Sequence, residues 1–170
     1  NDKDTRSEGR TYLAYIPLYQ GKFGKALEVL DDGIVADRME EAEGTWNAYK
    51  HRLKAKIYYE KKNLNLALKE QEKFMEIYHR VYPYEIAFGQ PTYVLLLAEN
   101  KEFEKAEQVA KSLRKAIVEK DTSQMYFYWY AVGCIELAKG NLEASLVDFK
   151  KAAKDVPIFM MHYMLARVYL

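Results

Sequence analysis

A short pattern that recurs four times along the chain constrains its fold more than any other feature. Each copy is a turn, then an aromatic residue or Leu, then a small residue that opens a helix-like stretch; the copies span 21–26, 62–67, 101–106 and 140–145. The small residues stand at intervals of 41, 39 and 39 positions: Ala26, Ala67, Ala106 and Ser145. A near-constant interval is the sequence signature of an architecture built from stacked repeats.

Each copy of the pattern joins two stretches that have the apolar spacing of an amphipathic helix. After the turns, apolar side chains recur every three or four residues, as at Phe23, Leu27, Leu30 and Ile34. Before the turns, similar stretches occupy about 9–20, 46–61, 91–100 and 123–139. The predicted unit is therefore helix, tight turn, helix. We expect the small residues where the two helices of a unit approach most closely, because a large side chain would force them apart.

Local signals support these boundaries. Pro91 suits the first turn of a helix, where its missing N–H leaves no hydrogen bond unmade. Gly140 predicts a left-handed stop after the 123–139 helix, and the start of that helix can be capped by Asp121, Thr122 or Ser123. Pro17 lies inside the first predicted helix and is expected to kink it.

The fourth unit resembles the tetratricopeptide repeat (TPR) family in its long-repeat form. The family's order of Trp, Leu-Gly, Ala, Phe and Pro is met by Trp129, Val132-Gly133, Ser145, Phe149 and Pro157. Val132 stands for Leu and Ser145 for Ala, which fit the size requirement, whereas Glu136 departs from the Tyr that is usual there. The other three units match mainly at the turn and the small residue. The resemblance implies an all-α fold, a right-handed α-α superhelix of about nine helices.

The resemblance also implies a single repeat array over 1–170. Its units are expected at about 9–45, 46–85, 90–120 and 123–156, with a partial fifth unit at 157–170. The last segment reads as the first helix of a pair, so we expect the chain to be a piece of a longer protein. The alternative is that this segment is the terminal cap that repeat arrays need, although 158–161 is very apolar for that role.

The composition of the chain argues against several classes of function. Lys+Arg and Asp+Glu number 26 and 25, whereas nucleic-acid binders usually show a basic excess. The chain has no run of about 18 apolar residues that would predict a membrane span. Cys134 has no partner for an internal disulfide and sits on an apolar helix, so it is expected to be a small buried residue. The spacing of the His and Cys residues fits no metal site. We predict that the chain is not an enzyme, that it binds no cofactor and that it is cytoplasmic.

In the TPR family the first helix of each unit lines a concave groove that holds a peptide or a partner helix. Transferring that face by register predicts groove residues Tyr15, Tyr19, Tyr49, Arg52, Lys56, Tyr59, Glu99, Phe127 and Tyr130, with Leu95, Cys134 and Leu137 on the same face. Residues 49, 52, 56 and 59 form one helical stripe. Residues 50–62 hold six Lys/Arg and a single acid, so we expect Arg52 and Lys56 to receive an acidic group. The alternative is that the tyrosines pack between repeats and the lysines form a solvated face.

The repeat pattern and the predicted groove face favour a protein–protein interaction scaffold, and the resemblance implies that it is part of a larger signalling or regulatory protein. Its expected partner is a protein or a peptide with acidic character. We do not expect it to bind nucleic acid or a membrane. The alternative is self-assembly into dimers or filaments through the open last helix at 157–170.

Overall fold

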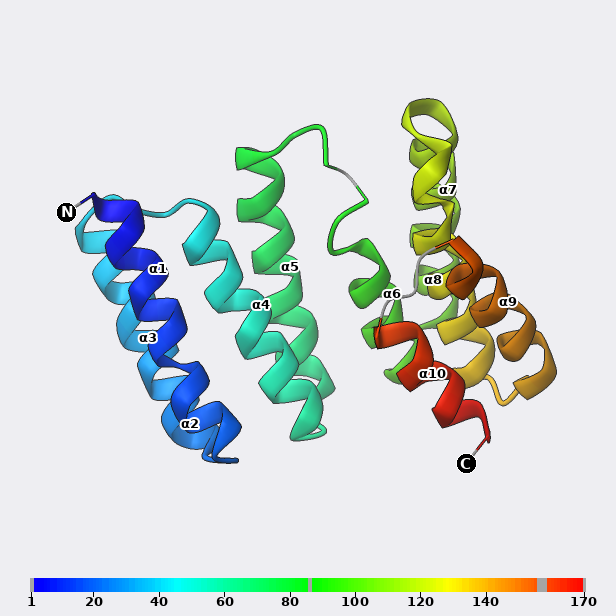
Figure 1. Cartoon of the computed structure of the whole chain (residues 1–170), viewed down its shortest axis with the longest axis horizontal. Helices are drawn as coiled ribbons and strands as arrows, with labels where there is room; N and C mark the ends of the chain where they lie inside the picture. The colour runs from blue at the N-terminus through cyan, green and yellow to red at the C-terminus, as the bar shows by residue number, and fades with distance from the viewer. Residues whose placement is uncertain (1, 86, 156–158, 170) are drawn as a thin grey trace. The chain divides into compact units, whose positions relative to one another are not determined.

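The computed structural model describes residues 2–85, 87–155 and 159–169, and the regular secondary structure within them is entirely helical (Figure 1). The helices form two compact units, Asn1–Tyr84 and Glu85–Leu170. The grouping of all helices into a single array with unit boundaries near 45, 85 and 120 stays a prediction.

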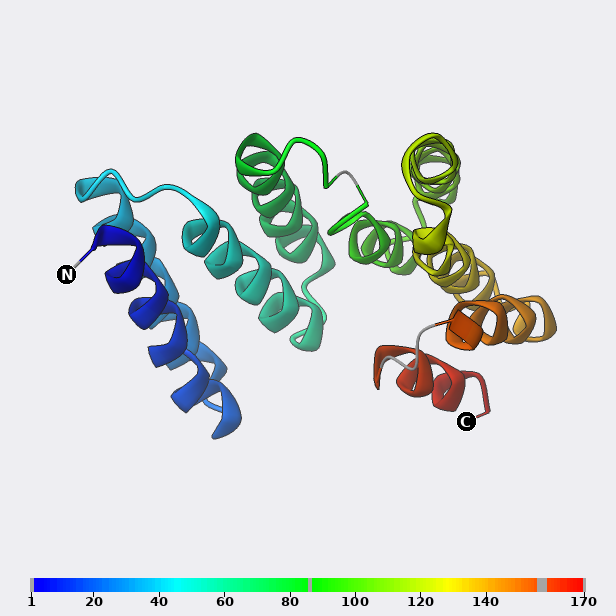
Figure 2. The same cartoon turned by 45° about the horizontal axis from the view of Figure 1, so that its top comes forward.

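Unit 1 contains five helices: α1 (Lys3–Leu13), α2 (Tyr15–Tyr19), α3 (Phe23–Met39), α4 (Thr45–Glu60) and α5 (Leu64–Val81). Helix α4 packs along α5 on one side and against α1 and α3 on the other (Figures 1 and 2). The apolar centre between α2, α3 and α4 consists of Ala14, Ala26, Leu30, Leu53 and Ile57. Helices α3 and α5 thus follow the turns at 21 and 62, as the recurrence predicts.

Unit 2 contains α6 (Gln90–Glu99), α7 (Phe103–Lys120), a 3-10 turn η1 (Thr122–Gln124), α8 (Met125–Ala138), α9 (Leu142–Asp155) and α10 (Phe159–Tyr169). Helix α8 contacts α6, α7 and α9, and α10 packs against α9 (Figure 2). The centre of the unit is formed by Tyr130, Cys134, Phe149, Ala152 and Met164. Pro157, the last residue of the TPR-like pattern, lies outside the described residues.

The first predicted helix is two helices, because the chain breaks at Ala14. Pro17 has no N–H and its ring would meet the carbonyl four residues earlier, so one continuous helix is unfavourable. The break puts Pro17 in the first turn of α2, where no N–H is needed. The prediction that α1 starts near residue 9 is wrong: α1 begins at Lys3, capped by Asp2. Its inward face carries the polar residues Ser7 and Thr11, which an apolar pattern does not reveal.

The four turns share one backbone geometry. Their left-handed residues are Gly21, Lys62, Lys101 and Gly140, with φ of 71°, 59°, 63° and 84°. In each turn this residue donates to the carbonyl three positions back and the next residue donates to the carbonyl five positions back; at the last turn the acceptors are Leu137 and Glu136. This is the Schellman ending of a helix. The prediction of a left-handed stop at Gly140 is confirmed, and two of the four turns achieve it with Lys.

Lys101→Gly is expected to raise the free energy of unfolding by about 1 kcal/mol. A residue with a Cβ is strained by about 1–2 kcal/mol in the left-handed region, and Gly removes this strain. Ordering the more flexible Gly on folding costs about 0.5 kcal/mol in return. Gly140→Lys, at the equivalent turn, is expected to lower stability by a similar amount. Urea unfolding measures both variants. Equal midpoints for both variants and the parent chain would contradict this interpretation of the turns.

The small residues of the recurrence are buried, as a close approach of two helices requires. Ala26, Ala67, Ala106 and Ser145 are all fully buried. Gly133 on α8 does the same for α9: a Cβ at this position would stand 2.7 Å from two ring carbons of Phe149. The size requirement is therefore physical, since there is no room for a further carbon at that crossing.

The predicted helix caps are also found, with one refinement. Pro91 lies in the first turn of α6, behind Gly89 at φ 89°. Asp121 accepts from the backbone N–H of Ser123 at 3.0 Å and so caps η1, the turn that leads into α8.

Candidate functional site

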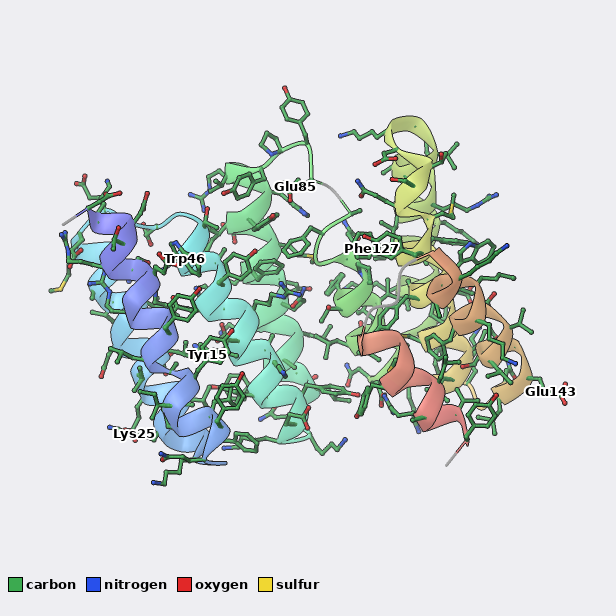
Figure 3. The ribbon with its side chains drawn as sticks, viewed as in Figure 1. Tyr15, Lys25, Trp46, Glu85, Phe127 and Glu143 are labelled. Carbon is green, nitrogen blue, oxygen red and sulfur yellow. The ribbon has the colours of Figure 1, made fainter. Side chains whose placement is uncertain are left out.

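The predicted groove residues belong to both compact units. Tyr15 and Tyr19 lie on α2, and α4 carries Tyr49, Arg52, Lys56 and Tyr59. Glu99 lies at the end of α6, and Phe127 and Tyr130 lie on α8. In Figure 3 the labelled Tyr15 and Trp46 lie between the ribbons of α1–α2 and α4, and Phe127 lies on unit 2.

Unit 1 carries a continuous row of aromatic rings that begins on α2 and crosses to α4. The ring of Tyr19 lies 5.9 Å from that of Tyr15, which lies 6.2 Å from Tyr12. Tyr12 then contacts Trp46 at 5.6 Å, and Trp46 contacts Tyr49 at 5.6 Å. These centroid separations are those of favourable aromatic pairs.

The row continues from α4 onto α5. The ring of Tyr49 lies 6.2 Å from Phe74 and 6.2 Å from Tyr78, and Tyr78 lies 4.9 Å from Tyr82. We call the whole set the aromatic row; it consists of Tyr19, Tyr15, Tyr12, Trp46, Tyr49, Phe74, Tyr78 and Tyr82. Tyr12, Tyr19 and Tyr82 are exposed, whereas Phe74 and Tyr78 are buried. The row is therefore anchored in the core and open to solvent along part of its length.

The sequence predicts three members of the row as groove residues: Tyr15, Tyr19 and Tyr49. It does not single out the other members as part of a binding surface. Tyr12 and Trp46 stand three residues before Tyr15 and Tyr49, and Tyr82 stands four after Tyr78. Neighbours at these distances share a helix face, so extending each stripe by one turn would have found them. The break at Ala14 leaves the stripe on α1 and α2 continuous, as the contact between Tyr12 and Tyr15 shows.

Arg52 lies against the aromatic row. Its Cζ stands 5.6 Å from the ring centroid of Phe74 and 6.0 Å from that of Tyr49. Burial lowers the pKa of Arg52, while the neighbouring tyrosines act in the opposite direction. A guanidinium stays charged in a protein even so, which gives the row a cation held by cation–π contacts. Lys56 is exposed one turn further along α4.

Two lysines of the basic 50–62 stretch do not contribute to the surface. Lys50 is fully buried, and its Nζ donates to the Ser7 carbonyl at 2.8 Å, the Ser7 Oγ at 2.9 Å and the Asp37 Oδ2 at 2.8 Å. These three acceptors match the three N–H groups of an ammonium, and the Trp46 carbonyl lies further away at 3.5 Å. Burial lowers the pKa of Lys50, while the hydrogen bond to Asp37 acts in the opposite direction and favours the charged lysine. Gly33 makes room for it, since a Cβ there would stand 2.8 Å from Lys50 Cε.

The carboxylate of Asp37 completes this buried cluster. It also accepts from Arg10 at 2.8 Å and from Asn47 at 3.2 Å. Burial alone would raise the pKa of Asp37, but the hydrogen bonds from Lys50, Arg10 and Ser7 outweigh it and lower the pKa. The cluster ties α1, α3 and α4 together through two ion pairs of Asp37, one with Arg10 and one with Lys50.

Lys54 is the second internally paired lysine. Its Nζ lies 2.7 Å from Asp31 on α3 and 2.7 Å from Glu70 on α5. Glu70 also contacts His51 Nδ1 at 2.6 Å. Both acids lie on neighbouring helices, so the charges of residues 50–62 alone do not include them. The positive surface of α4 is therefore smaller than the sequence suggests.

The three predicted residues of unit 2 have other surroundings. Tyr130 is 3% exposed and packs against Phe149 at a ring separation of 5.9 Å. Glu99 forms an ion pair with Arg167 of α10 at 2.8 Å. Phe127 is half-buried beside Tyr126, with ring centroids 4.3 Å apart. Tyr130 thus has almost no surface to offer a ligand, because the packing of α9 covers the face that register alone assigned to a groove.

The described residues hold no group of three or more His, Cys, Asp and Glu side chains placed to bind a metal ion. Cys134 is buried, as predicted, and its burial raises the pKa of the thiol, which disfavours the reactive thiolate. No helix in the described ranges combines the length and apolar character that crossing a membrane requires.

The sequence matches no family model and no curated protein. Solved structures are similar in fold. Two crystal structures of the putative kinesin light chain TPR-like repeats from Podosopora anserina, the first of a point mutant, give TM-scores of 0.67 and 0.66, each at 13% identity over 99% of this chain and 87% of that one. A MamA RS-1 double mutant gives 0.57 at 16% identity, over 99% of this chain and 84% of that one. The expectation of an all-α, TPR-like fold is confirmed.

Proposed function

We propose that the chain is a protein-interaction scaffold, without catalytic activity, whose unit 1 binds an extended peptide or a partner helix along the aromatic row. The observation that carries this proposal is the continuous contact from Tyr19 to Tyr82, part of it exposed. Tyrosine and tryptophan offer a large contact area and a hydrogen-bonding tip at low entropic cost, which is why they dominate binding surfaces. The TPR-like fold supports the same role.

The ligand is expected to carry an acidic group beside its apolar contacts. Arg52 is held against Tyr49 and Phe74, and Lys56 projects from the same helix into solvent. Both are positive, and two acids of the neighbouring helices, Asp31 and Glu70, are bound to Lys54. A carboxylate on the ligand would meet this positive edge of the row.

The double variant Tyr12→Ala with Tyr19→Ala is expected to bind its partners more weakly, because it removes the two most exposed rings from the row. The wild-type and variant chains are immobilised, and the proteins that each captures from cell extract are compared by mass spectrometry. Removing two aromatic anchors is expected to cost about tenfold or more in affinity. Lys56→Glu should weaken capture of the same proteins if their contact is acidic.

The matched control is Tyr163→Ala with Tyr169→Ala, two exposed tyrosines on α10. It should capture what the wild-type chain captures, with melting temperatures showing that both variants fold. An identical set of proteins on all three chains would contradict the proposal.

Self-assembly through the last helix is the second candidate, and the exposure of Tyr163 and Tyr169 favours it. The very apolar side chains at 158–161, on which the expectation first rested, lie outside what the structure describes. The control variant also tests this candidate: light scattering should show an assembly for the wild-type chain that the α10 variant loses. A wild-type monomer at high concentration would remove self-assembly.

A further inference from the structure

A shallow, positively charged hollow lies between α7 and α8 in unit 2, on helices that carry no member of the aromatic row. Its volume is about 510 Å³, and its lining consists of Lys111, Arg114, Lys115, Val118, Glu119 and Tyr128. Lys111, Arg114, Lys115 and Val118 stand at spacings of three, one and three, so they share one face of α7. Helix α7 contacts α8, and their labels are next to each other in Figure 1.

The cations of this hollow are only weakly neutralised by the chain. Among the described residues, the carboxylate that approaches the lining lysines is Glu119, at 3.9 Å from Lys115, and both side chains are exposed. Glu107, one turn before Lys111, is bound to Lys139 at 2.6 Å, and its interaction with Lys111 is the weaker of the two. Three cations against one acid leave the hollow with a positive charge, although the chain as a whole is nearly neutral.

Arg114 is positioned for a carboxylate. Its Cζ lies 5.7 Å from the ring centroid of Tyr128, which holds the guanidinium against the aromatic face. A guanidinium held in this way keeps its edge N–H groups for a planar, bidentate acceptor. Exposed Val118, one turn beyond Arg114, adds an apolar contact.

We propose that the α7–α8 hollow is a second binding site, for an acidic peptide segment of a partner protein that presents two carboxylates and an adjacent apolar side chain. One carboxylate meets Arg114, the other meets Lys111 and Lys115, and the apolar side chain contacts Val118. A single-stranded nucleic acid fits less well, because base stacking needs a free aromatic face and the ring of Tyr128 already contacts Arg114 and Trp129.

The test uses the whole chain and a fluorescein-labelled Ser-Glu-Glu-Leu-Glu-Glu-Leu-Ser peptide, followed by fluorescence anisotropy at low salt. The wild-type chain is expected to bind it, and the same peptide with Gln in place of each Glu should not bind. Lys111→Glu with Arg114→Glu should lower affinity at least about tenfold, because each cation becomes a repelling charge. Arg114→Lys should lower the affinity less, because the positive charge remains and only the paired N–H groups of the guanidinium are lost.

The matched control is Lys22→Glu with Lys69→Glu, two exposed lysines of unit 1 that make the same change in net charge. It should keep wild-type affinity, which shows that the effect of the hollow variant is local. The proposal is overturned if this control loses as much affinity as the hollow variant, or if the wild-type chain fails to bind the Glu peptide. Tighter binding of a labelled oligo-uridine that the Lys111/Arg114 variant loses would assign the hollow to RNA and would equally overturn it.

Discussion

Lys50→Met is expected to lower the free energy of unfolding by about 3–5 kcal/mol, the usual cost of removing one partner of a buried ion pair. Lys50 and Asp37 both have fully buried side chains, 2.8 Å apart. Methionine fills a similar volume, but it satisfies neither the carboxylate nor the Ser7 carbonyl and hydroxyl. Arg10 remains on Asp37 at 2.8 Å and keeps the loss from being larger. Urea unfolding followed by circular dichroism measures it.

Two further variants show whether charge is the cause. Lys69→Met removes an exposed lysine and should stay within about 0.5 kcal/mol of the parent chain. Lys50→Met with Asp37→Leu should recover part of the loss, because an apolar pair can replace a buried ion pair at little cost. A Lys50→Met chain as stable as the Lys69→Met chain would mean that the cluster contributes no net stability.

The same cluster predicts how stability depends on pH. Because the pKa of Asp37 is lower in the folded chain, the unfolded chain takes up this proton first. The contribution of Asp37 is therefore complete above the ordinary Asp pKa of about 4 and is lost as pH falls from there through the lowered folded value. Asp37→Asn should flatten that part of the acid unfolding curve.

Gly133→Ala is expected to lower the free energy of unfolding by about 1–3 kcal/mol, although alanine is the better helix former by about 1 kcal/mol. The new Cβ would stand 2.7 Å from Cδ1 and Cε1 of Phe149, closer than carbon atoms can approach. Phe149 is fully buried between α8 and α9, so its ring has no free space to move into. The helices must separate or the ring must leave its rotamer.

The chain supplies a matched control in Gly24. A Cβ at Gly24, in the first turn of α3, meets nothing within 4 Å. Gly24→Ala should therefore leave stability unchanged or raise it by up to about 1 kcal/mol. Phe149→Leu should cost less in the Gly133→Ala background than in the parent chain, since the smaller side chain relieves the clash. Equal effects of the two glycine substitutions would show that close packing at Gly133 is not the cause.

The fold was predictable because its determinants are local and periodic. A helix turn needs a left-handed residue, and the crossing that follows needs a small one, so both recur at the same interval in the sequence. The two deviations from the prediction arise where a local rule is incomplete. Pro17 breaks the helix three residues earlier than its own position, and α1 extends to Lys3 because polar residues form its buried face.

The candidate site was less predictable because it depends on contacts between distant segments. The stripe on α4 was visible, but nothing near Lys50 or Lys54 in the sequence indicates that Asp37 and Glu70 neutralise them. Tyr130 looked equivalent to Tyr49 by register, yet α9 buries the first while the second stays half-exposed. The hollow between α7 and α8 follows no motif, because its ring and its cations belong to different helices.

The Ser7–Lys50 contact has a consequence for how unit 1 opens. Two of the acceptors of the Lys50 ammonium are atoms of Ser7, and Asp37 also binds Arg10, so detaching α1 would break both the Ser7 hydrogen bonds and this ion pair. First helices usually fray at little cost. Because the same cluster also joins α3 to α4, we expect these three helices to open as one cooperative unit whose amide protons exchange together with solvent.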